Sequence, residues 1–125
     1  MDCYSVSEDL EGISGGGLYL IVINITQTGL TVDGHAGYAK TGNDIICAAV
    51  SVLAQGLAHS LSALTEDAIG YQFRDGHIDI EYENLSEEGK LLVDSFFIAV
   101  SDIQMTYGDQ YVKIDAAPNG RKTEV

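Results

Sequence analysis

The spacing of apolar residues predicts two helices. Between about residue 44 and residue 64 the apolar side chains recur at steps of three or four, so they form one stripe on an α-helix. The stripe consists of Ile46, Val50, Leu53, Leu57, Leu61 and Leu64. A second helix begins after a cap at Asn84 or Ser86, with Glu87 and Glu88 in its first turn. Its expected buried residues are Leu92, Phe96, Ala99, Val100 and Ile103.

Shorter segments rich in Ile, Val and Tyr predict the strands. They cover residues 18–26, 30–35, 71–74, 77–83 and 111–116. Thr28-Gly29 supplies the turn of a first hairpin, and Asp75-Gly76 that of a second. The order hairpin, helix, hairpin, helix, strand predicts an α+β domain with two principal helices. Its sheet is expected to be antiparallel or mixed and to form a two-layer structure with the helices.

The chain of 125 residues, 46% of them hydrophobic, is long enough for one domain with its own core. We expect this domain to cover residues 18–117. Residues 1–17 are polar and end in three glycines, so they are predicted to be a flexible leader, either a partner-binding arm or a tail without a role. Residues 118–125 are predicted to be a flexible tail.

Candidate chemistry concentrates between Asp33 and Leu53, where a histidine precedes a cysteine across a loop of small residues. Cys47 falls about one turn or less from the start of the first predicted helix, where unsatisfied N–H groups and the helix dipole favour a thiolate. It lies about 100° round from the apolar stripe, in line with Ser51, Ala54 and Ala58. We therefore expect Cys47 at the boundary of the core, accessible to a reactant.

His35 is the candidate base, because an imidazole within reach takes the thiol proton and returns a proton to a leaving amine. Gly34, Gly37 and Gly42 are expected to form a mobile substrate loop around the pair. Asp44 either caps the helix, which is the favoured role, or orients the histidine.

One pattern conflicts with this pairing. In a regular strand Leu30 and Val32 share one face, whereas Asp33 and His35 share the other, so His35 would point away from a helix packed on the apolar face. A bulge at Gly34, or a strand that ends there, would remove the conflict.

The run G-H-A at residues 34–36, followed by G-N-D-I-I-C-A-A-V-S at residues 42–51, resembles the signature of the Prp family of bacterial ribosomal-processing cysteine proteases. The resemblance implies a catalytic dyad at His35 and Cys47, no cofactor, and a homodimer. It also implies a substrate, the basic N-terminal extension of a large-subunit ribosomal protein, or a capsid or scaffold protein in a phage setting. Without the resemblance, a lone cysteine on a helix is more often a packed core residue than a nucleophile.

Composition limits the partners and the compartment. Six Lys and Arg against 19 Asp and Glu give a formal net charge of -13, which repels nucleic acid and attracts basic partners, although acidity also simply aids solubility. Two cysteines define no disulfide framework, and residues 1–17 contain no secretory signal, so we expect a reducing, cytoplasmic setting. The apolar run near residues 18–25 is too short to span a membrane.

Other functions are less favoured. The main alternative to a protease is a non-catalytic acidic module that binds a basic ribosomal or phage protein. A zinc domain is disfavoured by the cysteine count and by the spacing of His35 and Cys47. A metal site at His77, Asp79 and Glu81 is less favoured than a solvated outer sheet face, and His59 is expected to be a solvent-facing helical residue.

Overall fold

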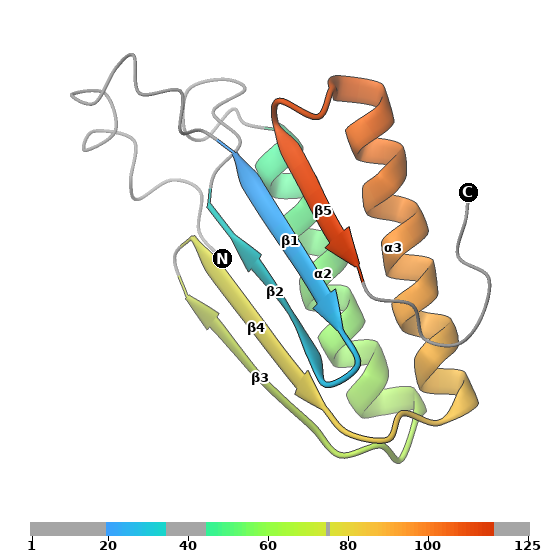
Figure 1. The fold of residues 1–125 in the computed structure, drawn as a ribbon. Helices are drawn as coiled ribbons and strands as arrows, with labels where there is room; N and C mark the ends of the chain where they lie inside the picture. Colours follow the sequence, from blue (N-terminus) through green and yellow to red (C-terminus); the bar gives the residue numbers. More distant parts are fainter. Residues whose placement is uncertain (1–19, 35–44, 75, 117–125) are drawn as a thin grey trace.

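The described chain consists of one five-stranded sheet and two long helices (Figure 1). The structure is a computed structural model, and it describes residues 20–34, 45–74 and 76–116. The strands are β1 (Ile21–Thr26), β2 (Gly29–Asp33), β3 (Ile69–Arg74), β4 (His77–Tyr82) and β5 (Val112–Ala116). The helices are α2 (Ile45–Leu64) and α3 (Glu87–Tyr107).

The sheet is mixed, with the strand order β3-β4-β2-β1-β5. The β1–β2, β2–β4 and β3–β4 pairs are antiparallel, whereas β5 returns after α3 and pairs with β1 in parallel. The predicted α+β class is therefore confirmed. The first turn differs slightly from the prediction, since it lies at Gln27 and Thr28 and Gly29 already belongs to β2.

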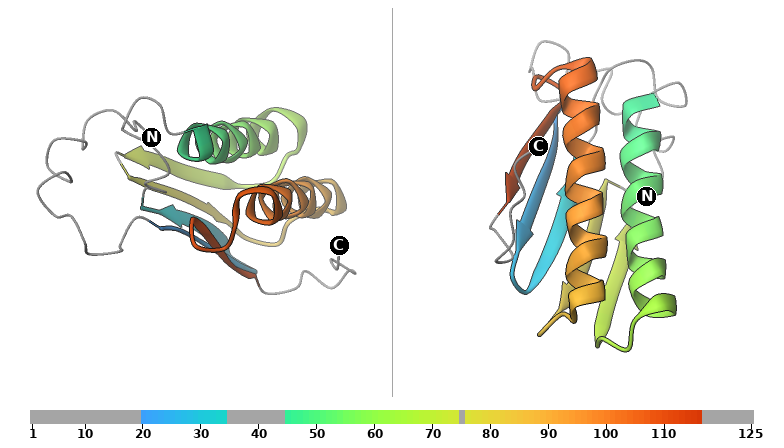
Figure 2. Two further views of the ribbon diagram at one scale, coloured as in Figure 1. Left: turned by 90° about the horizontal axis from the view of Figure 1, so that it is seen from above. Right: turned by 90° about the vertical axis from the view of Figure 1, so that its right-hand side faces the viewer.

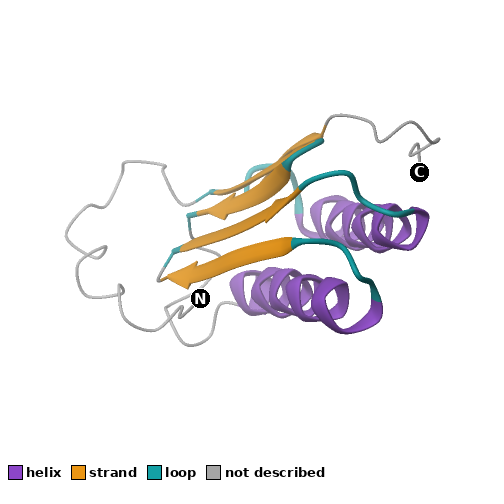
Figure 3. Ribbon diagram, turned by 90° about the horizontal axis from the view of Figure 1, so that it is seen from below, coloured by secondary structure: helices purple, strands orange, loops and turns teal. Residues whose placement is uncertain are grey.

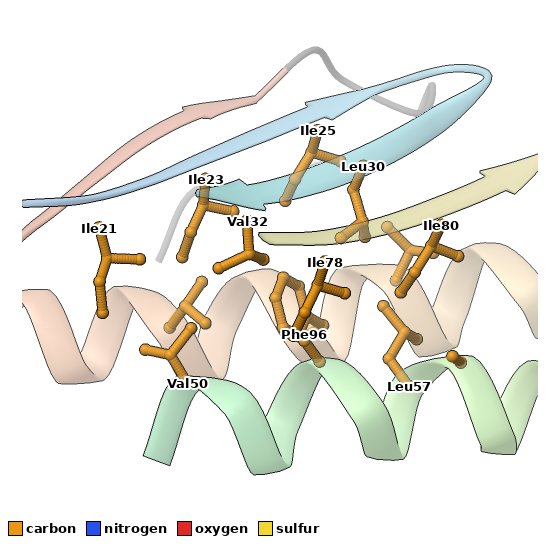
Figure 4. Packing of buried hydrophobic residues seen from close by; sticks show 14 of the residues in the cluster. Ile21, Ile23, Ile25, Leu30, Val32, Val50, Leu57, Ile78, Ile80 and Phe96 are labelled. Carbon is orange, nitrogen blue, oxygen red and sulfur yellow. The ribbon is translucent and has the colours of Figure 1, made fainter. Parts of the chain in front are cut away.

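Both helices cover the same face of the sheet, so the molecule has two layers (Figures 2 and 3). Side chains alternate along the strands because successive residues of a strand point to opposite faces. Every second residue of β1 and β4 is buried beneath the helices, and Figure 4 shows the resulting core. In β4 these residues are Ile78, Ile80 and Tyr82, as the sequence predicts. The opposite face of the sheet carries polar residues such as Thr31, Asp33 and Asp79.

The start of α3 follows the sequence closely. Ser86 is the N-cap, and its hydroxyl accepts a hydrogen bond from the Gly89 backbone N–H at 3.0 Å. Glu87 and Glu88 lie in the first turn, where carboxylates are favourable to the helix dipole. The buried face is rotated by part of a turn from the prediction: Val93, Phe96 and Val100 are buried, while Leu92, Ala99 and Ile103 are only half-buried.

The predicted stripe of α2 is confirmed in part. Leu64 is 70% exposed and Leu53 is half-buried, lining a groove between α2 and α3. On the other flank of the helix, His59 contacts two aromatic residues of β3. The side between these flanks is buried and carries the four other stripe residues, Ile46, Val50, Leu57 and Leu61. Beside them it carries a sheet-facing line of small residues, Cys47, Ser51, Ala54 and Ala58, which are also buried. Small side chains allow the helix backbone to lie close to the sheet in a close-packed core.

By length and composition, α2 is also apolar enough to cross a membrane. The core helix of a domain has the same character, and eight residues of α2 are buried in this structure. Packing on the sheet and against α3 therefore accounts for its apolar sequence.

We predict that Ala54→Leu destabilises the domain, because the sheet-facing line of α2 has no room for a larger side chain. The expected cost is about 1–3 kcal/mol in the free energy of unfolding. Ala63→Leu is the matched control, since Ala63 is exposed on the same helix and should change stability by no more than about 0.5 kcal/mol. Urea unfolding followed by circular dichroism measures both, and equal stabilities for the two variants would contradict the packing described here.

Candidate active site

The strand that leads toward His35 ends at Gly34. β2 stops at Asp33, and Gly34 has a φ of 100°, a conformation that residues with a Cβ rarely adopt. The Gly34 N–H donates to the Gly76 carbonyl oxygen at 2.9 Å, and a Cβ at this position would clash with the carbonyl oxygen of Leu20. The alternation of side chains along β2 therefore stops before His35. A strand that ends at Gly34 is one of the two arrangements under which His35 need not share the face of Asp33 and point away from α2.

Cys47 is the third residue of α2 and lies in its first turn, as predicted. The backbone N–H groups of the first turn of an α-helix point toward its start. The positive end of the helix dipole lies in the same place, and it favours a thiolate over a thiol.

The expectation that Cys47 lies at the boundary of the core is wrong. Its exposed fraction is 0%, and so are those of Ala54 and Ala58 on the same line. The reason is that the buried side of α2 is wider than the predicted stripe and also includes the line of small residues to which Cys47 belongs. Cys47 is also disulfide-bonded in this structure.

Four of the predicted site residues, His35, Gly37, Gly42 and Asp44, lie outside the described residues. The predicted dyad, the glycine loop and the role of Asp44 therefore remain predictions. The end of β2 and the start of α2 lie at the same end of the molecule (Figure 1).

Two contacts near these elements are not evident from the sequence. His77 Nδ1 pairs with Asp33 Oδ1 across β2 and β4, where the two residues are register partners. His59 is exposed, as expected, but its ring also lies edge-on to Tyr71 and Phe73, with centroid separations of 5.7 and 5.9 Å. The first contact joins residues 44 positions apart in the chain and depends on the strand register. The second joins the consecutive elements α2 and β3 and depends on how the helix lies on the sheet.

No group of three or more His, Cys, Asp or Glu side chains in the described part of the chain could hold a metal ion. Of the residues considered for a metal site on β4, His77 pairs with Asp33. Asp79 and Glu81 lie on the helix-free face of the sheet.

Comparison with known proteins identifies the family. The model of the family described as cysteine protease Prp matches residues 21–113, which include the positions of His35 and Cys47. The chain belongs to the Prp family. It is accordingly a cysteine protease.

Relatives support the Prp assignment along most of the chain. The ribosomal processing cysteine proteases Prp of two Staphylococcus aureus strains, Mu50 and NCTC 8325, are each 27% identical over 99 residues, which is 72% of this chain and 93% of theirs. The crystal structure of the S. aureus protease with a covalently linked product peptide superposes with a TM-score of 0.69 at 22% identity, covering 78% of this chain and 98% of the other. The complex of that protease with a substrate peptide gives a TM-score of 0.65 at 21% identity over the same shares. These structures share the fold described above.

We predict that Gly34→Ala lowers stability by more than about 1 kcal/mol, because alanine disfavours the positive φ and its Cβ meets the Leu20 carbonyl oxygen. Gly56→Ala is the control. Gly56 lies on the exposed side of α2 with nothing near its missing Cβ, so the change should stabilise the domain by up to about 1 kcal/mol. Thermal unfolding of both variants tests this, and a Gly34→Ala protein as stable as wild type would show that β2 does not end as described.

Proposed function

We propose that this protease removes the basic N-terminal extension of a large-subunit ribosomal protein, with His35 as the base and Cys47 as the nucleophile. A phage capsid or scaffold protein is the alternative substrate of the same class. One observation carries the proposal: Cys47 occupies the first turn of α2, at the end of the molecule where β2 leads into His35.

The chemistry follows from these two side chains. His35 takes the proton of the Cys47 thiol, and the sulfur attacks the carbonyl carbon of the scissile peptide bond. The imidazolium gives its proton to the nitrogen of the leaving amine as the C–N bond breaks, which leaves an acyl-enzyme. Water, deprotonated by His35, then attacks the thioester carbonyl and releases the acid and the free thiol.

The start of α2 also offers a means of stabilising the transition state. A tetrahedral intermediate places negative charge on the former carbonyl oxygen, and preorganised N–H donors lower its energy. We propose that backbone N–H groups at the start of α2 supply such donors.

The substrate class is supported by the relatives and by charge. The S. aureus relatives are named ribosomal processing proteases, and one was crystallised with a substrate peptide. The formal net charge of -13 attracts a lysine- and arginine-rich tail and raises its encounter rate. Direct binding to ribosomal RNA would be opposed by the same charge.

Activity requires the reduced form of the protein. A sulfur within a disulfide is no nucleophile, so Cys47 must be reduced for catalysis. Because thiols stay reduced in the cytoplasm, we propose that the protease works there. The homodimer that the family resemblance implies remains a prediction.

The test is cleavage of a synthetic peptide corresponding to the N-terminal extension of a bacterial large-subunit ribosomal protein, followed by mass spectrometry with and without reductant. We expect a single cut by the reduced wild type and none without reductant. Cys47→Ala and His35→Ala should each lower the rate by about 100-fold or more. His59→Ala is the matched control and should cut at the wild-type rate, because His59 lies on the exposed flank of α2.

Cleavage by Cys47→Ala at the wild-type rate would contradict the assignment of the nucleophile. Binding of the peptide without any cut, in reduced wild type, would favour the acidic binding module instead. A cut in a phage scaffold peptide but none in the ribosomal one would select the alternative substrate.

A further inference from the structure

Asp33 and His77 form a side-chain pair at the end of the sheet nearest the candidate site. They are register partners on β2 and β4, and His77 Nδ1 contacts Asp33 Oδ1. Their side chains are 49% and 29% exposed, so the pair is only half-buried. Asp33 directly precedes Gly34 and stands two residues before His35 in the chain.

The pair lies on the face of the sheet opposite to α2. Val32 and Ile78, the neighbours of Asp33 and His77, are buried beneath the helices, so the pair points to the helix-free face. Cys47, on the sheet-facing line of α2, lies on the other side. Asp33 and His77 therefore have no direct access to the reacting sulfur, and any effect on it passes through the backbone.

Backbone contacts connect the Asp33–His77 pair to Gly34, the residue before His35. One step beyond the pair, the Gly34 N–H donates to the Gly76 carbonyl oxygen, which extends the β2–β4 contact to the residue before His35. On its other side, Gly34 lies against the Leu20 carbonyl, just before β1. The end of β2 is thus held between the starts of β1 and β4, and the Asp33–His77 pair is the side-chain contact that joins β2 to β4 there.

We propose that Asp33 and His77 are positioning residues that fix the end of β2 and, through Gly34, the place from which His35 reaches Cys47. The consequence for catalysis rests on the dyad proposed above. A half-exposed pair of polar side chains contributes little to stability. A larger loss of rate on removing the pair would therefore report on geometry and not on unfolding, since small displacements of a catalytic group are costly.

The first measurement needs no substrate. Hydrogen exchange of the Gly34 amide, followed by NMR, reports directly on its bond to Gly76. We expect Asp33→Ala and His77→Ala each to speed this exchange several-fold, while the midpoint of thermal unfolding changes little. Asp79→Ala is the matched control, because Asp79 lies on the same face of β4 two residues farther from Gly34, and it should leave the exchange unchanged.

The second measurement uses peptide cleavage by reduced protein. We expect each alanine variant to lower kcat about tenfold with KM unchanged, and the double variant to be no slower than either single one, because the residues act as a unit. His77→Gln, which retains a hydrogen-bond donor to Asp33, should recover part of the lost kcat. Asp79→Ala should cleave like wild type.

Unchanged Gly34 exchange in both alanine variants would overturn the positioning role, whether or not the protein cleaves the peptide. Wild-type kcat in both variants, or a double variant whose loss is the product of the single losses, would overturn it as well. Absence of cleavage by reduced wild type would instead contradict the proposed function, and the exchange measurement would still decide the inference.

Discussion

The close packing of α2 on the sheet is the constraint on which the candidate site depends. The buried face of the helix combines the large residues Ile46, Val50, Leu57 and Leu61 with the small residues Cys47, Ser51, Ala54 and Ala58. This face fixes the rotation of the helix about its own axis. It also fixes where the sulfur of Cys47 lies, because Cys47 belongs to the buried face and to the first turn.

The second constraint is the end of β2. Gly34 stops the regular strand with a positive φ, and the neighbouring backbone of Leu20 and Gly76 encloses it on both sides. β2 ends at the end of the molecule where α2 begins (Figure 1). This arrangement of the two elements agrees with the proposed dyad of His35 and Cys47.

Local patterns in the sequence predicted the elements well. The alternation in β4, the cap at Ser86 and the position of Cys47 in a first turn all depend on near neighbours in the chain, and the structure confirms each. The apolar stripe of α2 was right for Ile46, Val50, Leu57 and Leu61, which are buried. It missed the buried small residues beside the stripe, because apolar periodicity weighs leucine above alanine, whereas a close-packed helix also buries small side chains. The Asp33–His77 pair was missed for another reason. It depends on the register between β2 and β4, which are separated by a helix and a strand.

The central claim is that an imidazole from the end of β2 activates the sulfur at the start of α2. The most direct measurement is the rate at which iodoacetamide alkylates Cys47 at pH 6 in reduced protein, with Cys3→Ser introduced so that a single thiol is observed. An ordinary thiol is almost wholly protonated at this pH, so a fast reaction requires a stabilised thiolate. The account predicts that His35→Ala slows alkylation about tenfold while His59→Ala does not. Equal rates in all three proteins would contradict it.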